Sequence, residues 1–359
     1  MQNSFIEKSK DIIKEAIERI KEAVDRLEPP EVFDLNKKSV LNICAAVAVD
    51  AGQTLFRGVF KNIGIVVYQV ASSKEEDPIQ SYAFWTSPGL PDNERRAIIS
   101  QQLERLQTED SIIAEFVKAM GWIAIHQKGV MPDSCFRSSS AFSSFIRDLL
   151  EWSRLYELGK QLQNYVKKEL GIQPVLLRDG TLRFASLAEG HTNRLSKIFQ
   201  ELEVPIFGVT KNSALLRSPD VYYWLQKNKV YDRKGPIIIP INKQMFEELG
   251  WRLERYFGDN GMRFGRYALV RFDPMPGSQN VFAVDIPNYL DWNKVLVLLS
   301  GIAQQATAST YPMPGYPFAL KKAHDKAVLS EHRVSLLEST FKRTLPVEVY
   351  ELLKNLSLF

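Results

Sequence analysis

Apolar residues near the amino terminus recur at steps of three and four positions, the spacing that places side chains on one face of an α-helix. The stripe lies within residues 5–27, with lysines and glutamates between its members, and consists of Ile6, Ile12, Ile13, Ile17, Ile20, Val24 and Leu27. Glu28-Pro29-Pro30 ends the pattern, because proline does not continue a helix. Residues 1–30 are therefore predicted to form an amphipathic helix that packs on its own domain or on a second copy of the chain, with docking to another partner as the less common alternative.

From residue 41 the pattern changes to short apolar runs separated by glycine, asparagine and charged residues, which is typical of strands. LNICAAVAVD, RGVFKNIGIVVYQV and QSYAFWTS predict three successive strands, and helical patterns follow at about 92–120 and 142–169. PVLLRDG predicts a buried strand that ends in a turn, residues 191–203 a helix, and PIFGVTKNS another strand. The predicted order is β-β-β-α-β-α-β, an α/β fold.

The remainder of the chain predicts further strands at GPIIIPI, YALVRF and VFAVDIP. An apolar helix is expected at about 292–308, then a loop rich in proline, glycine and tyrosine, and a final helical region that ends at Phe359. We expect one domain over residues 40–359, with a core at about 41–215 that the later strands and helices complete.

Composition limits the class of protein. The 359 residues are 45% hydrophobic and 25% charged with a net charge of +4, as in a soluble globular protein whose charge permits a nucleic-acid partner without requiring one. Two cysteines are too few for a disulfide framework or a cysteine zinc site, which favours a reducing compartment. The charged amino terminus and the short apolar runs predict a cytoplasmic protein, neither exported nor embedded in a membrane.

Two aspartates follow buried strands and are the candidates for metal chemistry. Asp50 closes ICAAVAVD and Asp179 closes PVLLRD, so both carboxylates lie at one edge of the sheet if the two strands are adjacent and parallel. Adjacent carboxylates repel each other, and Mg²⁺ or Mn²⁺ relieves that repulsion. Pairs of these ions promote phosphodiester cleavage. Alone, each aspartate is as well explained by a turn at a strand end.

Four short motifs occur in an order that resembles the NurA nuclease family, whose fold is that of ribonuclease H. These motifs are VAVDAGQ, RDGTL, VTKNS and GYPFALKKAHDKA, and they span about 280 residues. Ala51 departs from the resemblance, because the family more often has a second glycine after the acid. The resemblance implies a ribonuclease H-like mixed sheet flanked by helices, with additional helices at both ends of the chain.

Such a fold supplies a third acid from the helix before the strand that ends at Asp179. Glu157 lies 22 residues before Asp179, which suits the length of a helix that runs back beside that strand. Glu151 lies 28 residues before it, and it shares a helix face with Leu155, Leu158 and Leu162, so it points toward the sheet. Length favours Glu157 and direction favours Glu151; we give preference to Glu157.

The resemblance also implies that Tyr316 and His324 complete the active centre, with His324 at the start of a helix as a metal ligand or proton carrier. Lys211 in VTKNS is expected at the same sheet edge, where it binds a DNA phosphate or remains a solvated turn residue. Arg263 and Arg266 alternate with aromatic residues in RLERYFGDNGMRFGRYALVRF, a composition that suits a single-strand groove, although such alternation is more common in a core strand.

These observations lead to the hypothesis of a Mn²⁺- or Mg²⁺-dependent deoxyribonuclease. The resemblance implies 5′–3′ end resection of single-stranded DNA or duplex ends in double-strand break repair, a homodimer, and a HerA-type hexameric ATPase as partner. A separate ATPase is consistent with the sequence, which contains no G-x-x-x-x-G-K-[ST] nucleotide-binding loop. The alternatives are a catalytically silent adaptor on such an ATPase and a different ribonuclease H-like activity, such as an RNase or a resolvase.

Overall fold

The structure is a computed structural model. It describes residues 2–35, 44–57, 64–86, 89–166, 173–182, 184, 189–211, 216–242, 245, 257–258, 261–262, 265–273, 275, 280–306 and 313–344. The helices are α1 (Gln2–Asp25), α2 (Asp92–Glu109), α3 (Ser111–Met120), α4 (Asp133–Arg137), α5 (Ser139–Val166), α6 (Glu189–Glu201), α7 (Pro219–Lys227), α9 (Trp292–Gln304), α10 (Phe318–Ala327) and α11 (Glu331–Thr344).

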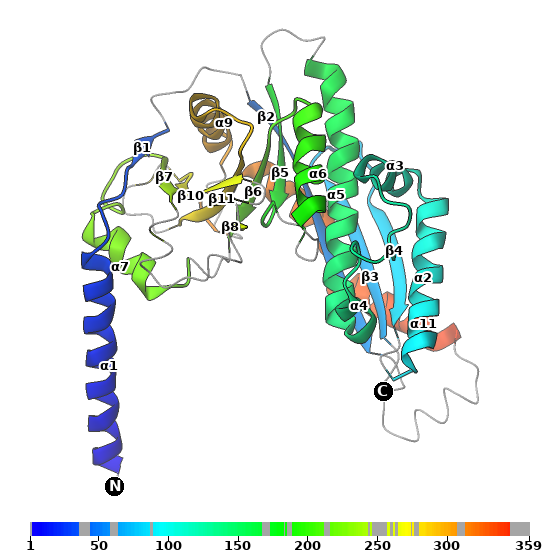
Figure 1. The fold of residues 1–359 in the computed structure, drawn as a ribbon, viewed down its shortest axis with the longest axis horizontal. Coiled ribbons are helices and arrows are strands. Elements are labelled where there is room, and N and C mark those ends of the chain that lie inside the picture. Colours follow the sequence, from blue (N-terminus) through cyan, green and yellow to red (C-terminus); the bar gives the residue numbers. More distant parts are fainter. Residues whose placement is uncertain are drawn as a thin grey trace.

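One nine-stranded sheet runs through the molecule in the order β1-β7-β10-β11-β6-β5-β2-β3-β4 (Figure 1). Its strands are β1 (Phe33–Asp34), β2 (Cys44–Arg57), β3 (Gly64–Ser72), β4 (Gln80–Thr86), β5 (Gln173–Asp179), β6 (Ile206–Thr210), β7 (Ile237–Ile241), β10 (Gly265–Arg271) and β11 (Phe282–Pro287). A separate short pair is formed by β8 (Phe257–Gly258) and β9 (Gly261–Met262).

Five strands form the ribonuclease H-like core. β2, β3 and β4 pair antiparallel in sequence order, and β5 then pairs parallel to the other side of β2, followed by β6 parallel to β5. The resulting spatial order, third-second-first-fourth-fifth strand of the core, is that of ribonuclease H. The predicted fold class and the predicted adjacency of the strands that carry Asp50 and Asp179 are both confirmed.

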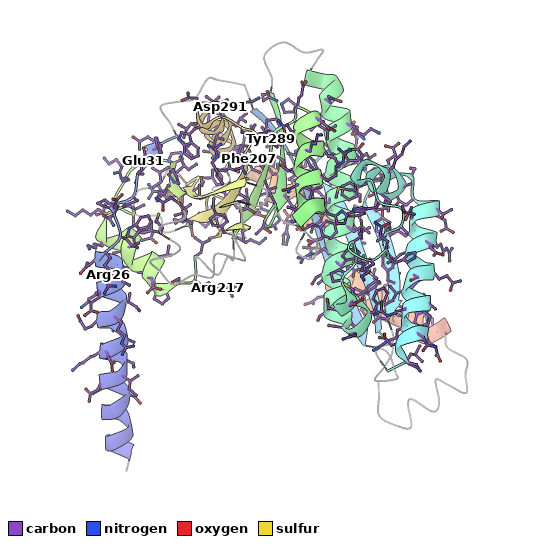
Figure 2. The ribbon with its side chains drawn as sticks, viewed as in Figure 1. Arg26, Glu31, Phe207, Arg217, Tyr289 and Asp291 are labelled. Atoms are coloured by element: carbon purple, nitrogen blue, oxygen red, sulfur yellow. The ribbon has the colours of Figure 1, made fainter. Side chains whose placement is uncertain are left out.

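Helices cover both faces of this core, because the apolar side chains of its strands alternate between the two faces. In β5, Leu176 packs in the cluster with α2, α3, α5 and α6, whereas Val175 and Leu177 pack in the cluster with α9 and α10. Figure 2 shows Phe207 of β6 within the body of the molecule, where it is fully buried. The sheet therefore separates α5 from α10, and each of these helices approaches the strand ends from its own side.

Residues 92–120, expected to be helical, form two helices because Asp110 separates α2 from α3. The Asp110 carboxylate accepts hydrogen bonds from the backbone N–H groups of Ile112 and Ile113 at 2.9 and 3.0 Å, which caps the new helix. The sequence patterns did not predict β1, α4 or α7, which are only two, five and nine residues long.

The amphipathic helix predicted near the amino terminus is α1, and it extends away from the sheet (Figure 1). Its carboxyl-terminal end packs near α7, where Val24 and Leu27 are buried. Farther from the body, Ile12, Ile13 and Ile17 are 67%, 58% and 45% exposed. Half of the apolar stripe is thus uncovered in a single chain. Among the described helices, none is both long enough and apolar enough to cross a lipid bilayer.

Candidate metal centre

Asp50 and Asp179 are brought together by the parallel pairing of β2 and β5. Val49 is the register partner of Arg178, so the two aspartates are the next residues on neighbouring strands. By strand alternation each lies on the α10 face, two positions after Ala48 and Leu177, which pack in the same core as α10. The Oδ1 atom of Asp50 accepts a hydrogen bond from the Ala51 backbone N–H at 2.8 Å.

His324 reaches the two aspartates from α10, a helix packed directly on β2. The His324 Nδ1 atom lies 2.7 Å from Asp50 Oδ2, although 274 residues separate the two along the chain. The prediction that His324 lies at the start of its helix is wrong: α10 begins at Phe318, and His324 lies in its last turn. Pro317 is the N-cap of α10, and the helix packs on β2 and β3 before its last turn places the imidazole beside Asp50.

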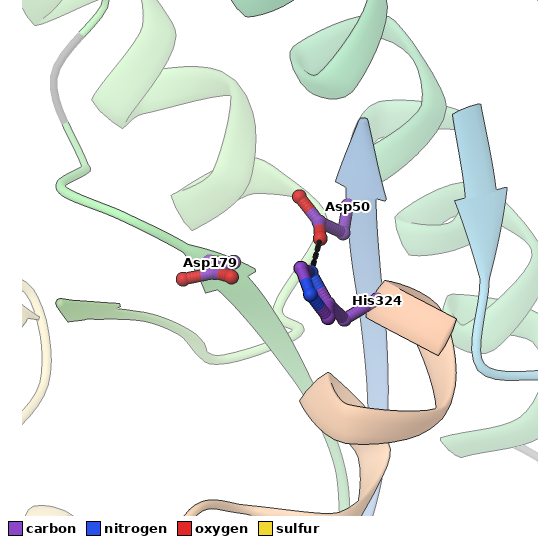
Figure 3. Close-up of side chains that lie close together, drawn as sticks. All are labelled: Asp50, Asp179 and His324. Atoms are coloured by element: carbon purple, nitrogen blue, oxygen red, sulfur yellow. Dashed lines mark hydrogen bonds and ion pairs between the residues drawn. The ribbon is translucent and has the colours of Figure 1, made fainter. Parts of the chain in front are cut away.

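Asp50, Asp179 and His324 form a compact ligand set, shown in Figure 3. Asp179 ends β5 and His324 lies in the last turn of α10, but Asp50, expected at the end of its strand, lies in the middle of β2, which continues to Arg57. One ligand atom from each residue lies within 4.8 Å of the others. The hydrogen bond to Asp50 raises the pKa of His324, while partial burial and the nearby Lys211 cation act in the opposite direction. Two carboxylates and one imidazole are a donor set that suits Mn²⁺. Mg²⁺ would bind through the carboxylate oxygens of the same set. The residues present therefore fit a divalent ion.

Lys211 and Tyr316 lie against this set, as expected from the sequence. The Lys211 ammonium is 2.8 Å from Asp179 Oδ2 and 5.0 Å from the centre of the Tyr316 ring. Tyr316 is fully buried, and burial together with the charge of Asp179 raises the pKa of its hydroxyl group, which stays protonated. Lys211 thus places a positive charge beside the aspartates, over the Tyr316 ring.

The two candidate glutamates on α5 occupy different places. Glu157 forms an ion pair with Arg154, accepts a hydrogen bond from Gln161 at 3.3 Å, and lines a surface pocket between α3 and α5. Glu151 is 2% exposed, and burial raises its pKa, with the charges of Asp148 and Asp50 acting in the same direction. The preference for Glu157 rested on helix length, but Glu157 contacts Arg154 and Gln161 of its own helix, whereas Glu151 binds Arg178 of β5. The contacts favour Glu151.

Sequence reasoning missed Arg178, the residue immediately before Asp179. Arg178 is 3% exposed, on the α5 face of β5, and it binds Glu151 and Asp148. A signal was present in the sequence: an arginine at the end of the buried run PVLLRD requires a carboxylate partner, because an unpaired cation is costly to bury.

Of the two arginines proposed as DNA contacts, Arg266 is not brought to the metal centre. Arg266 is the second residue of β10, which lies three strands from β5 in the sheet, with β11 and β6 between them. Its side chain donates to the Leu290 carbonyl and lies 5.3 Å from the Trp292 ring. Arg263 lies outside the described residues.

The fold and this site define a ribonuclease H-like protein with a candidate centre for a divalent metal. The sequence matches no protein-family model and no curated protein. The structure is similar to that of the NurA nuclease from Sulfolobus solfataricus, with 15% sequence identity and a TM-score of 0.41, over 94% of this chain and 95% of that chain. A second NurA structure has 11% identity and a TM-score of 0.43, over 96% and 99% of the two chains. The catalytic domain of human endonuclease V has 13% identity and a TM-score of 0.32, over 93% and 98%. NurA is also the family that the sequence motifs resemble.

Proposed function

We propose that this protein is a metal-dependent deoxyribonuclease. The observation that carries the proposal is the convergence of Asp50, Asp179 and His324, from three distant parts of the chain, with one ligand atom of each within 4.8 Å of the others. Asp50 and Asp179 would hold Mn²⁺ or Mg²⁺, and His324 would act as a third ligand or as a proton carrier. When bound, the ion supplies Lewis-acid stabilisation of the charge that develops on a phosphodiester.

The remaining roles follow from position and charge. Lys211, beside Asp179, would bind a nonbridging phosphate oxygen of the substrate, since an ammonium group acts as a point charge for phosphate. The buried Tyr316 ring lies beside the Lys211 ammonium group, and its hydroxyl group stays protonated. Tyr316 would therefore hold Lys211 in place or hold its own hydroxyl proton near the phosphate. Of the two α5 glutamates, Glu151 is the one that reaches β5, but it binds Arg178 on the α5 face and is not in the ligand group, so we assign it a supporting role behind Asp179.

We further propose that DNA is the substrate and that the reaction belongs to end processing, of the 5′–3′ resection type that serves double-strand break repair. The support is the order of VAVDAGQ, RDGTL, VTKNS and GYPFALKKAHDKA, whose acids, lysine and histidine form the site described above. The same resemblance supports a HerA-type hexameric ATPase as partner, a cytoplasmic location and a homodimer. The uncovered isoleucines of α1 are a surface through which a second copy could bind.

The decisive experiment measures cleavage of end-labelled single-stranded DNA, duplex DNA and an RNA–DNA hybrid with Mn²⁺, with Mg²⁺ and with EDTA. Asp50→Asn and Asp179→Asn should abolish the metal-dependent cleavage while circular dichroism shows an intact fold. Asp110→Asn is the matched control, because it changes a carboxylate that caps α3 outside the site and should leave cleavage unchanged. If the wild-type protein cuts none of the substrates, or if the Asp50 and Asp179 variants cut as well as the wild type, the nuclease proposal fails and an adaptor role replaces it.

A further inference from the structure

A buried arginine lies directly behind the metal centre. Arg178 precedes Asp179 in β5, and its side chain points to the α5 face of the sheet while that of Asp179 points to the α10 face. A guanidinium group that is removed from water needs partners for its charge and for its N–H groups. The described contacts of Arg178 show where those partners come from.

Two of the partners belong to α5. The Arg178 Nε and Nη2 atoms donate to Glu151 Oε2 at 3.0 and 2.7 Å, and Nη2 also donates to Asp148. The centre of the guanidinium group lies 5.1 Å from the Trp152 ring, which is fully buried. Arg178 thus attaches the end of β5 to one turn of α5, between residues 148 and 152.

The third partner belongs to the turn that follows Asp179. The Arg178 Nη1 atom donates to the backbone carbonyl of Thr181. This hydrogen bond connects the end of β5 to the turn that follows it, with Asp179 between the two bonded residues. The same turn is held by Gly180 N–H to Val209 O at 2.9 Å and by Leu182 N–H to Asp285 Oδ2 at 2.7 Å. The backbone on both sides of Asp179 is therefore fixed by contacts made away from the metal.

We propose that Arg178 is a positioning residue for the metal centre: its guanidinium group ties α5 to the turn after Asp179 and thereby holds the Asp179 carboxylate opposite Asp50 and His324. This inference rests on the proposed function only in that it requires the metal site. The clamp, meaning Arg178 with Asp148, Glu151 and the Thr181 carbonyl, makes its contacts on the α5 face and the turn and leaves the α10 face to the metal ligands. Groups that orient metal ligands change metal affinity when they are altered.

Lysine is the informative replacement, because it keeps the positive charge but cannot bind two carboxylates and a carbonyl through one planar fork. Arg154→Lys is the matched control. Arg154 is also a buried arginine, 4% exposed, but it belongs to α5 itself and pairs with Asp77 and Glu157, which are not among the metal ligands. Both changes remove buried charge-assisted hydrogen bonds, so both should lower the melting temperature by a similar amount.

The experiment measures Mn²⁺ affinity of the full chain by isothermal titration calorimetry, alongside the melting temperature and DNA cleavage. Arg178→Lys should weaken Mn²⁺ binding about tenfold or more, whereas Arg154→Lys should leave it within about twofold of the wild type. A folded Arg178→Lys protein with wild-type Mn²⁺ affinity would overturn the proposal, even if its melting temperature is lower. Equal loss of affinity in both arginine variants would also overturn it, because that result indicates general destabilisation.

Asp148→Asn provides a second, milder variant in case Arg178→Lys does not fold. It weakens one arm of the clamp and leaves Arg178 paired with Glu151, so the fold should be retained and Mn²⁺ affinity should fall by roughly threefold to tenfold. Unchanged affinity in this variant counts against the clamp. The metal readout also separates the two proposals: a wild-type protein that binds Mn²⁺ but cuts no DNA contradicts the nuclease function, while the affinities of the variants still decide the role of Arg178.

Discussion

The backbone of Gly52 lies so close to α10 that a Cβ atom at this position would be 2.1 Å from the Ala327 carbonyl oxygen. One turn earlier in α10, His324 meets Asp50, which lies two residues before Gly52 in β2. Helix and strand therefore make direct backbone contact beside the metal centre, and the distance between them sets the position of the imidazole.

Replacing Gly52 by alanine should push α10 away from β2. We expect a loss of stability of roughly 2 kcal/mol or more, the scale of overpacking in a core, and a larger relative loss of Mn²⁺ affinity and cleavage as His324 moves. Thermal unfolding and Mn²⁺ titration measure the two effects. Gly190→Ala is the control, because a Cβ atom there meets nothing within 4 Å and alanine suits a helix better than glycine. Wild-type metal binding by Gly52→Ala would show that the contact does not position His324.

The metal-free protein should lose stability as pH rises through the pKa of His324. That pKa is raised above its ordinary 6.5 by the hydrogen bond to Asp50, so the protonated imidazole stabilises the fold below the unfolded pKa, and this contribution disappears above the folded pKa. Mn²⁺ affinity should change in the opposite direction, because the ion competes with the proton and binds more tightly at higher pH.

Melting temperatures in EDTA and Mn²⁺ titrations at several pH values between about 5.5 and 8.5 test this pair of trends. His324→Gln should flatten both curves over that interval. Parallel pH slopes in the variant and the wild type would assign the effect to other groups.

Lys211→Met should separate metal binding from catalysis. The ammonium group 2.8 Å from Asp179 opposes a cation at the same carboxylate, so its removal should strengthen Mn²⁺ binding several-fold. Cleavage should nevertheless fall by about 10²-fold, because the positive charge that would bind the DNA phosphate is removed. Single-turnover cleavage at saturating Mn²⁺ measures the second effect independently of the first. A variant that gains affinity and keeps its rate would restrict Lys211 to balancing the charge of Asp179.

Glu151→Gln and Glu157→Gln should differ strongly. Glu151→Gln removes a buried carboxylate that binds Arg178 behind Asp179, and we expect a loss of cleavage of about 10- to 100-fold. Glu157→Gln changes a partly exposed ion pair with Arg154, which should alter stability by only about 0.5–1 kcal/mol and leave the rate near that of the wild type. Rate constants for the two proteins, prepared in parallel, decide between the glutamates; the reverse order would restore the choice based on helix length.

The exposed part of α1 provides a test of the proposed homodimer. Serine at Ile12, Ile13 and Ile17 together should shift the molar mass measured by light scattering from that of two chains to that of one. The stability of the isolated chain should change little, because these side chains are largely exposed within it.

A control for that experiment replaces Asp11, Glu15 and Glu22 by serine, on the opposite face of α1. The control should keep the mass of the wild type. A wild-type protein that is already a single chain in solution at micromolar concentration would contradict the dimer.

The core of the fold could be predicted because its elements carry strong local patterns. The apolar runs of β2, β3, β5 and β6 are short and bounded, and the order of strands and helices is sufficient to place Asp50 beside Asp179. Lys211 was predicted to be at the same edge for the same reason: it follows the next parallel strand. These placements depend on backbone topology, which the hydrophobic pattern predicts.

The rest of the site depends on the directions in which side chains point, and the hydrophobic pattern of the sequence does not predict these directions. Helix length alone does not decide between the α5 glutamates, because length places a residue along the helix axis and does not fix its contacts, and Glu151 rather than Glu157 binds Arg178 of β5. The role of Arg178 became visible only once Asp148, Glu151 and the Thr181 carbonyl were placed around it. His324 was found through its motif, since no local pattern links it to Asp50, 274 residues away.

That separation has a consequence for the synthesis of the protein. The strand that carries Asp50 leaves the ribosome before the strand that carries Asp179, and the His324 imidazole follows only with α10, after all the strands of the described sheet. A chain that stops before α10 contains both aspartates and all nine strands of the described sheet but lacks His324 and the helix that covers β2. Truncated and nascent chains that lack α10 cannot assemble the complete centre, so a protein able to cut DNA would acquire that ability only after α10 has been synthesised.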